Sequence, residues 1–484
     1  MNERVRPYLY YDLALALCTT CLARVEAKIV FEDGCVWLDK RCLRHGKERV
    51  LLADDVDYWR RAREIFLKPS EMPARWNTPV RWGCPYDCGL CPDHEQHSCL
   101  TLIELGDGCN LECPVCYAAS SPKTMRWHSL ETIERMLDAV VANEGEPDVV
   151  QLSGGEPTLH PEFERVLELM RARPIRHRML NTNGIRIARE DGFAEKLAAY
   201  QPGFEIYLQF DSLEKEALLD LRGADLRRVR EKALLKLNAL DVSTTLVVTV
   251  KQGINDHELG KIVDFALQQP CVRGVTFQPI QDAGRNAGYD AGKHRLTLTG
   301  VRRRILEQTR VFRPEDVLPV PCHPDAIAMA YALKVEGQVV PLTGMIEPKV
   351  LIEGARNTIV YEGERALHTE LFKLLATNHS PESSASTLKD LLCCLPKVAL
   401  PAGLGYRNLF RVIILAFQDA QSLDVRSVKK SCVHIVHPED GRLIPFETYN
   451  LFYRGGLEKE RLAPLRAAVE PFAACEAHGT TTRA

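Results

Sequence analysis

Three cysteines in the first quarter of the chain have a spacing suited to iron–sulfur chemistry. Cys109, Cys113 and Cys116 form the pattern C-x3-C-x2-C within GDGCNLECPVCYAAS. Three thiolates can bind three irons of a cubane cluster and leave the fourth iron open to another ligand. A zinc knuckle and a four-cysteine ferredoxin cluster are the alternatives. Because the triplet directly follows an apolar, β-rich run, we expect it at the carboxyl end of a strand, where ligands of parallel sheets gather.

A glycine-rich turn follows the next apolar run. Val149–Leu152 leads into the sequence SGGEP, residues 153–157. Gly154 and Gly155 allow the backbone to approach a ligand closely, and Glu156 offers a carboxylate for an amino group. By itself such a turn is most often only a turn. Because this turn follows the strand after the cysteine triplet, it favours a ligand site shared by the two loops.

A second cysteine group precedes the triplet. Cys84, Cys88 and Cys91 repeat the C-x3-C-x2-C spacing, and Cys99 follows after seven further residues. Four cysteines predict a fully ligated auxiliary cluster that moves electrons or holds the structure together. A zinc site is the alternative.

A third group, at the N-terminus, has the ligand types of a mononuclear metal site. A C-x2-C pair and a C-x2-H pair flank a segment with a hairpin turn at Asp33–Gly34, which would bring the two pairs together. Such a site is tetrahedral and holds Zn or a rubredoxin-like Fe. If Cys35 took the place of the histidine, iron would be favoured. The preferred ligands are Cys18, Cys21, Cys42 and His45.

The C-terminal third contains more dispersed cysteines. One lies in PCHP, two in LLCCLP and one in KKSCVH, and we interpret them as ligands of a further cluster. Buried structural thiols are the alternative. The residues concerned are Cys322, Cys393, Cys394 and Cys432. Cys271 and Cys475 look incidental.

Regular elements that could position these loops fill the middle of the chain. Apolar β-rich runs alternate with helix-period segments, which predicts a parallel α/β sheet and, with six units, an open barrel. The predicted strands are Leu100–Leu105, Val149–Leu152, Arg178–Asn181, Glu205–Gln209, Thr244–Val250 and Gly274–Gln278. The predicted helices are Leu130–Val141, Pro161–Arg171, Leu226–Leu240 and His257–Gln268.

Composition narrows the class of protein. The 484 residues include 17 Cys and carry a net charge of −3. The cysteines stand in groups among polar residues, so we expect metal ligands in a reducing, cytoplasmic setting instead of disulfides. The near-neutral charge gives no reason to expect a nucleic-acid partner. The best apolar run, Val412–Phe417, is far shorter than the ~20 residues of a spanning helix, so any membrane contact would be peripheral.

The cysteine triplet and the SGGEP turn together resemble the radical S-adenosylmethionine (SAM) superfamily over about residues 99–280. The resemblance implies that the triplet holds a 4Fe–4S cluster, that its open iron chelates SAM, and that the cluster splits SAM to a 5′-deoxyadenosyl radical. An electron donor such as flavodoxin or ferredoxin would reduce the cluster. The resemblance places four residues at SAM: Tyr117, Gly154, Gly155 and Glu156. Four residues at later strand ends would serve SAM or substrate, with turn and helix-capping roles as their alternative: Asn181, Asn183, Gln209 and Asp211.

The whole layout resembles one branch of that superfamily, the tetraether lipid synthases and class D radical SAM methylases. The matching features are the C-x2-C…C-x-x-HG start, WGCPYDCGLC, GDGCNLECPVCYA and the PC…LLCC…C…GRLIPF tail. This chain has Glu447 after the PF of the tail, where that family often has cysteine. A carboxylate there could still bind iron.

The preferred function is the coupling of lipid hydrocarbon chains through abstraction of hydrogen from unactivated carbon. A methylase acting on a pterin-like or other small molecule is the first alternative, and an iron–sulfur electron carrier the second. We predict an α/β protein built on a partial (β/α)6 radical SAM barrel, with an N-terminal metal ribbon and a cysteine-bearing C-terminal α+β domain. The predicted regions are the ribbon, 1–75; the auxiliary cluster segment, 76–99; the barrel, 100–290; and the C-terminal domain, 291–484.

Overall fold

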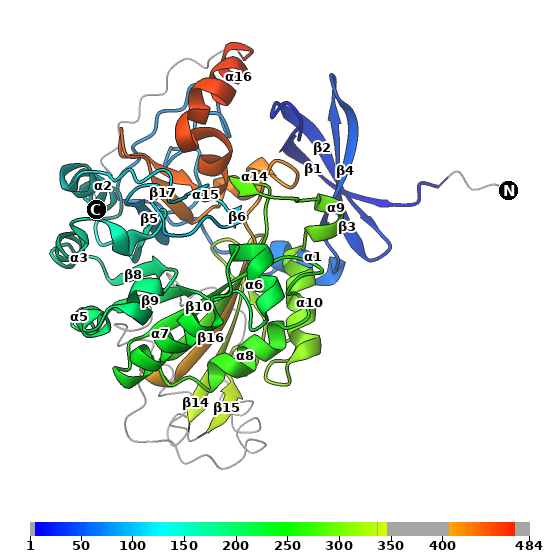
Figure 1. The fold of residues 1–484 in the computed structure, drawn as a ribbon. Coiled ribbons are helices and arrows are strands. Elements are labelled where there is room, and N and C mark those ends of the chain that lie inside the picture. The colour runs from blue at the N-terminus through cyan, green and yellow to red at the C-terminus, as the bar shows by residue number, and fades with distance from the viewer. Residues whose placement is uncertain (1–4, 336, 346–405, 470–484) are drawn as a thin grey trace, which may run out of the picture.

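The N-terminal segment folds into its own four-stranded antiparallel sheet, in the order β1-β2-β3-β4. The computed structural model describes residues 5–335, 337–345 and 406–469. The strands are β1 (Leu9–Leu17), β2 (Arg24–Glu32), β3 (Cys35–Cys42) and β4 (Gly46–Ala53). Asp33 and Gly34 both have positive φ between β2 and β3, as a two-residue type I′ hairpin requires. The predicted hairpin is confirmed, and the sheet projects from the rest of the molecule in Figure 1.

Six parallel strands form the centre of a second, larger sheet. They are hydrogen-bonded in chain order from β5 to β11, with each strand parallel to the next. The strands are β5 (Leu100–Glu104), β7 (Val149–Ser153), β8 (His177–Thr182), β9 (Phe204–Gln209), β10 (Thr244–Val250) and β11 (Val272–Pro279). All six predicted strands are therefore present, as a partial barrel.

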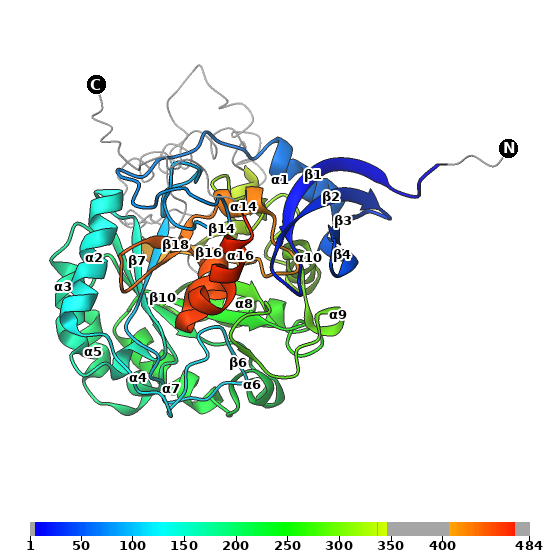
Figure 2. The same cartoon turned by 90° about the horizontal axis from the view of Figure 1, so that it is seen from above.

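Helices cover the outer face of these strands, as Figure 2 shows from above. They are α2 (Leu130–Glu144), α3 (Phe163–Arg171), α4 (Ile185–Arg189), α5 (Phe193–Ala198), α6 (Lys215–Arg222), α7 (Arg227–Ala239) and α8 (Leu259–Leu267). The four predicted helices correspond to α2, α3, α7 and α8. Their buried apolar faces pack on the sheet in one continuous core.

The C-terminal part extends this sheet at both edges. One strand pairs in parallel with β11 and another in parallel with β5, and antiparallel strands follow on each side. The added strands are β13 (Leu318–Pro319), β14 (Ile327–Val335), β15 (Gln338–Pro341), β16 (Leu409–Leu415), β17 (Val433–Val436) and β18 (Leu443–Pro445). Strands on the two sides of the predicted boundary at residue 290 thus belong to one sheet.

Shorter elements complete the described chain: α1 (Val56–Glu64), α9 (Ala291–His294), α10 (Leu298–Gln308), α14 (Val425–Lys429), α15 (Phe446–Thr448) and α16 (Ala463–Ala467). Within the described ranges, none of the helices combines the length and the apolar character needed to span a bilayer.

A buried ion pair ties the C-terminal strand β16 to the barrel strand β9. Arg411 of β16 donates a hydrogen bond of 2.5 Å to Oε1 of Glu205. His177 Nε2 lies 3.1 Å from the other carboxylate oxygen, and Glu205 is fully buried. Burial alone would raise the pKa of Glu205, but Arg411 and His177 outweigh it and hold this pKa well below its usual range. The pairing depends on residues 206 positions apart.

Candidate active site and metal centres

The cysteine triplet lies in the loop that leaves the carboxyl end of β5. The loop is held by a two-residue strand, β6 (Val115–Cys116), which pairs with β12 (Arg285–Asn286). The Arg285 guanidinium donates to three loop carbonyls, those of Cys113 (2.5 Å), Ala119 (3.2 Å) and Ser120 (2.7 Å). Arg285 is a functional residue that the sequence patterns did not indicate, because its partners are backbone atoms of a distant loop.

The three thiols of this loop line one cavity of about 160 Å³ inside the barrel. Cys109 and Cys113 are buried and Cys116 is half-buried. Burial raises the pKa of Cys109 to about 12, and it raises the pKa of Cys113 as well. A buried thiol of this kind is neutral unless a metal ion displaces its proton. Three thiols that line one cavity fit the three protein ligands of a cluster with one open iron.

The glycines of SGGEP bring the end of β7 against the backbone of the cysteine loop. A Cβ on Gly155 would lie 1.9 Å from the Gly108 carbonyl oxygen, and one on Gly154 would lie 2.5 Å from that of Gly106. Gly154 also has φ +115°. Gly155 N–H donates to the Gly106 oxygen at 3.0 Å. The sequence argument gave ligand approach as the reason for these glycines, whereas the structure shows that contact between two protein loops already requires them.

Glu156 is buried and its carboxylate is heavily engaged. One oxygen accepts from the Thr158 N–H (3.2 Å), from the Thr158 hydroxyl (2.6 Å) and from the Thr182 hydroxyl (2.7 Å). Within the described residues, the other oxygen accepts one hydrogen bond, from the Asn183 N–H at 2.8 Å. Since a carboxylate oxygen can accept about two hydrogen bonds, this second oxygen keeps room for an amino group. Glu156 lines the same cavity as the thiols.

The two asparagines at the end of β8 link the neighbouring loops. Asn181 donates to the Ser153 hydroxyl at 3.4 Å. The same Ser153 hydroxyl lies 2.9 Å from the Tyr117 hydroxyl. Asn183 donates to the Asn110 side chain at 2.7 Å and accepts from the first N–H of α4 at 3.0 Å. Asn183 thus has the turn role foreseen as its alternative, since its side chain accepts from the N–H two residues on, while both residues also line the cavity.

Asp211 is held by arginines that the sequence patterns did not indicate. It is fully buried with φ +67°, and Arg222 donates to its two oxygens at 2.6 and 2.7 Å. Gln209 donates to the same carboxylate at 2.7 Å. Arg230 forms a longer ion pair at 3.5 Å, and its two terminal nitrogens have no hydrogen-bond partner although they are buried. Both arginines line the cavity, so they could receive an anionic group there.

The N-terminal ribbon brings its four preferred ligands together. The Cys18, Cys21 and Cys42 sulfurs and a ring nitrogen of His45 all lie within 4.8 Å of one another. The His45 Nδ1 is 3.4 Å from the Cys18 sulfur and 3.5 Å from the Cys42 sulfur. Cys35 lies at the opposite end of β3 from Cys42 and is not in the group. The donor set therefore fits a closed tetrahedral site with His45 as the fourth ligand.

A second group differs from the predicted quartet. The sulfurs of Cys99, Cys322 and Cys432 lie within 4.8 Å of one another, so Cys99 does not lie with Cys84, Cys88 and Cys91 as expected. The reason is that Cys99 immediately precedes β5 and Cys432 precedes β17, the strand that pairs with β5.

The remaining predicted ligands separate into two groups. Cys84 interacts with Cys88 and Cys91, which keeps these three together. Cys393 and Cys394 lie outside the described residues.

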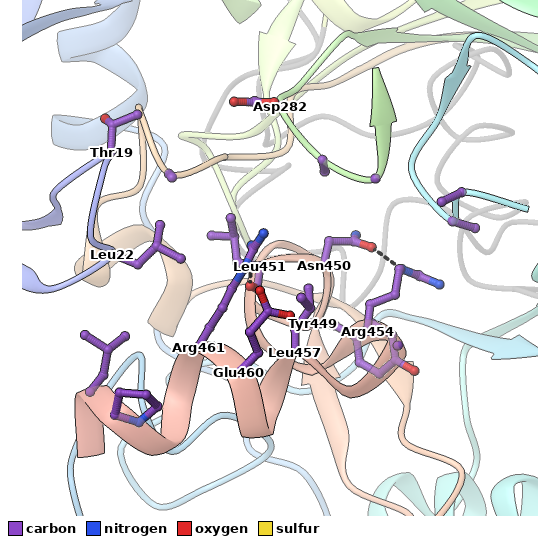
Figure 3. Close-up of a pocket in the computed structure, with 18 of the residues that line it drawn as sticks. Thr19, Leu22, Asp282, Tyr449, Asn450, Leu451, Arg454, Leu457, Glu460 and Arg461 are labelled. Carbon is purple, nitrogen blue, oxygen red and sulfur yellow. Dashed lines mark hydrogen bonds between the residues drawn. The ribbon is translucent and has the colours of Figure 1, made fainter. Parts of the chain in front are cut away.

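A wide cleft of about 1410 Å³ opens beside the cysteine loop. Figure 3 shows Thr19 and Leu22 of the ribbon together with side chains of the C-terminal segment that line the cleft, namely Tyr449, Arg454, Leu457, Glu460 and Arg461. Ser120 and Ala283 line both this cleft and the barrel cavity, so the two spaces adjoin. Arg454 pairs with Glu104 at 2.7 and 2.9 Å at the cleft wall.

Comparison with known proteins matches these features. Residues 103–266 match the radical SAM superfamily, and residues 10–54 match the HMPTM N-terminal zinc ribbon domain. A 7,8-dihydro-6-hydroxymethylpterin dimethyltransferase of Methanocaldococcus jannaschii is 30% identical over 93% of this chain and 96% of its own length. The chain belongs to the radical SAM superfamily.

Two further similarities each cover less than half of this chain. A GTP 3′,8-cyclase of Chlorobaculum tepidum is 28% identical over 40% of this chain and 59% of its own length. The crystal structure of Streptococcus suis SuiB bound to S-adenosylmethionine is 18% identical, with a TM-score of 0.35, over 43% of this chain and 46% of that one.

Membership of the superfamily confirms several predictions. The protein is a radical SAM enzyme that uses a 4Fe–4S cluster and SAM, and the electron-carrier alternative is set aside. The mononuclear ribbon site is confirmed by the zinc ribbon match and by its four converging ligands. Radical SAM enzymes need a reductant and a substrate, and neither is identified by these comparisons.

Proposed function

We propose that this radical SAM enzyme is a class D methylase that forms a C–C bond on a small polar heterocycle of the pterin class. The observation that carries the proposal is the convergence of the cysteine loop, the Glu156 turn and two buried arginines on one cavity beside a polar cleft. The M. jannaschii relative, similar over nearly its whole length, is named for methyl transfer to a pterin, which supports the methylase alternative over the lipid coupling that the sequence features favoured.

The residues of the cavity have separable tasks in this proposal. Cys109, Cys113 and Cys116 would hold three irons of the cluster, which with bound SAM would supply the radical chemistry that activates a C–H bond of the substrate. Glu156 accepts the amino group of SAM at its less occupied oxygen. Arg230, whose terminal nitrogens lack a hydrogen-bond partner despite the long ion pair with Asp211, receives the carboxylate. The surrounding strands exclude water from the radical.

The cleft is better suited to a polar heterocycle than to two alkyl chains. Its walls carry acidic and basic side chains, among them Glu104, Asp107, Arg126, Asp282 and Arg461. Burying alkyl chains against such groups would remove water from charged side chains, several of which are only partly paired within the cleft, and this costs free energy. A heterocycle with several donors and acceptors can pair with them, and this difference favours the methylase.

The test uses the full-length protein, reconstituted anaerobically with iron and sulfide and reduced with dithionite, flavodoxin or ferredoxin. A reduced 6-hydroxymethylpterin is supplied with SAM labelled in its methyl group and, separately, with a methylene-labelled folate. The expected result is 5′-deoxyadenosine together with label bound to carbon of the pterin. The protein with Cys109, Cys113 and Cys116 replaced by Ala is the control for background label.

Two outcomes would overturn the methylase. The first is loss of hydrogen from membrane lipids with joined chain ends, which restores lipid coupling. The second is label that stays out of every small heterocycle tested while deoxyadenosine is formed, which leaves only the superfamily chemistry.

A further inference from the structure

The spaces inside the barrel follow one another from the cleft inward. Ser120 lines both the wide cleft and the cavity of about 160 Å³ at the radical triplet. Gln151 and Tyr207 line both that cavity and a smaller one of about 40 Å³. None of the described residues lines both the cleft and the small cavity. Ser120 therefore lies at the mouth of the middle cavity, and Gln151 lies at its inner end.

Gln151 is a buried amide in the middle of β7, with apolar neighbours. Only 3% of the residue is exposed, and the adjacent strands place Leu102 and Met179 beside it. These two side chains offer no strong hydrogen-bonding group. Within the described residues, the side-chain oxygen of Gln151 has no hydrogen-bond partner. Because an unpaired buried amide costs free energy, we expect its partner to come from a molecule bound in the cavity.

Other glutamines of the same wall already have partners within the protein. Gln209 donates a hydrogen bond to Asp211 at 2.7 Å. Gln278 donates to the Tyr207 hydroxyl at 3.3 Å. Both glutamines line the cavity that Gln151 lines. Gln151 is thus the one of these three whose buried oxygen is left for a ligand, and this difference singles it out.

Aromatic rings supply flat surfaces in the same cavity. Phe417 and Phe446 stack with ring centroids 3.9 Å apart and an angle of 23° between the planes. Tyr117 lies against Phe446, with 5.1 Å between centroids, and all three rings line the cavity. Apolar walls with a few placed polar groups are typical of small-molecule sites, in which the polar groups fix the orientation. A planar heterocycle fits such walls.

The chemistry of an amide side chain narrows the class of ring. A carboxamide carries an acceptor oxygen and a donor nitrogen side by side. Its complement is the lactam edge of a heterocycle, where a ring N–H lies next to a C=O. The pyrimidine ring of a pterin has this edge, with N3–H beside the oxygen on C4.

We propose that Gln151 is the residue that recognises the lactam edge of the substrate ring. This inference rests on the proposed methylation of a pterin and adds the group that selects it. The Gln151 oxygen accepts a hydrogen bond from the ring N3–H, and the amide nitrogen donates to the oxygen on C4. The ring enters from the cleft past Ser120. Gln151 therefore discriminates against rings in which N3 carries no hydrogen.

The first experiment measures binding without turnover. Full-length protein, reconstituted with iron and sulfide and left unreduced, is dialysed to equilibrium with SAM and one of two ligands. These are 7,8-dihydro-6-hydroxymethylpterin and its N3-methylated derivative. The unsubstituted protein should bind the unmethylated pterin roughly tenfold more tightly, since methylation removes a hydrogen bond at the buried amide.

Gln151→Leu keeps the approximate volume of the side chain but removes its polar atoms. It should weaken binding of the unmethylated pterin about tenfold and reduce the preference over the methylated ligand to about twofold, since the contact between protein and N3–H is gone. Gln268→Leu, at an exposed glutamine, should keep the full preference. SAM affinity, measured in the same dialysis, reports that the cavity is intact, and Gln151→Met repeats the test if leucine disturbs it.

Turnover separates recognition from chemistry. With the reduced protein, Gln151→Leu should raise KM for the pterin about tenfold and change kcat much less. A fall in kcat with KM unchanged would contradict a role in recognition.

Two binding results would also overturn the inference, and they are distinguishable. An unchanged preference in Gln151→Leu, with SAM bound normally, would show that Gln151 pairs inside the protein or with water, and it would leave the proposed methylase standing. Failure of the unsubstituted protein to bind either pterin would overturn the proposed function and this inference together.

Discussion

The N-terminal ribbon and the cysteine loop of the barrel both use closely spaced cysteines, but they present them differently. In the ribbon, four ligand atoms lie within 4.8 Å of one another, which is the complete ligand number of a closed zinc site. In the barrel loop, three thiols line a cavity of about 160 Å³ that Glu156, Arg222 and Arg230 share. A closed site stabilises structure, whereas an open site binds a further ligand and can do chemistry.

The supports of the two sites differ in the same way. The ribbon packs on a small core of its own strands and α1, so its ligands depend on local structure. The barrel loop depends on contacts from distant segments, such as Arg285 on its carbonyls and Gly155 against Gly108. Substitutions that remove local contacts in the ribbon, or distant contacts at the barrel loop, therefore test whether the two sites are held in place differently.

The largest effect is expected at the open site. Replacing Cys109, Cys113 and Cys116 by Ala should abolish SAM cleavage and remove about four irons per chain, because no other ligands can hold that cluster. The measurements are 5′-deoxyadenosine formation and iron content after reconstitution. The ribbon metal should remain. Deoxyadenosine at the unsubstituted rate would rule out this site as the radical centre.

The next effect concerns the sheet beneath the loop. Arg411→Met leaves Glu205 buried without its arginine and should lower the free energy of unfolding by about 3–5 kcal/mol. Because the pKa of Glu205 is lowered in the folded state, its stabilising contribution is present above the unfolded carboxyl pKa of about 4.3 and is lost as the pH falls. The difference between the two proteins in urea unfolding should therefore shrink under acid conditions.

The control for this variant is Arg407→Met, at an exposed arginine just before β16, which should unfold like the unsubstituted protein. An equal loss of stability from both substitutions would show that the buried pair has no special contribution.

A smaller effect is expected from the contact between the two loops. In Gly155→Ala the new methyl would meet the Gly108 oxygen at 1.9 Å, so the loops must separate. A displacement of about 1 Å at a catalytic site can reduce the rate about 100-fold, and deoxyadenosine formation measures it. Gly292→Ala, where the nearest atom is a side-chain oxygen at 3.3 Å, should retain the rate. Equal rates for the two variants would contradict the role of the glycine contact.

The smallest effect on SAM chemistry is expected from the closed site. Cys21→Ala should remove one metal ion per chain and reduce the yield of folded protein, while the affinity for SAM changes by no more than about twofold, because the two sites are separate. Cys35→Ala should keep the metal, since Cys35 is outside the ligand set. Loss of SAM binding by well-folded Cys21→Ala protein would show that the sites are coupled.

The sequence was most informative where the relevant contacts are short in range. Six strands were predicted within two residues because each is an apolar run of the length that a buried parallel strand needs. The ribbon ligands were predicted because a hairpin with a two-residue turn leaves its ends little freedom. The radical triplet was recognised because three ligands within eight residues need no long-range contact to converge.

The assignments that failed, or were absent, all depend on pairs far apart in the chain. Spacing grouped Cys99 with Cys84, but strand pairing between β5 and β17 places it beside Cys432. The contacts of Arg222 and Arg285 were not predicted, because no sequence pattern indicates which residue an arginine in a helix or loop will contact. The choice between lipid coupling and methylation also lay beyond the sequence, since the polarity of the cleft depends on segments from the ribbon, the barrel and the C-terminal part.

By itself the sequence determined the six barrel strands, the membership of the radical SAM superfamily and the ligand types of the ribbon, because these follow from local hydrophobic pattern, short motifs and the short reach of the backbone. Only the tertiary structure decided which cysteine joins which metal group, why Gly154 and Gly155 must be glycine, and which buried charges face each other. Those contacts form when strands of one sheet come from both ends of the chain, and no spacing along the sequence records the distance between them in space.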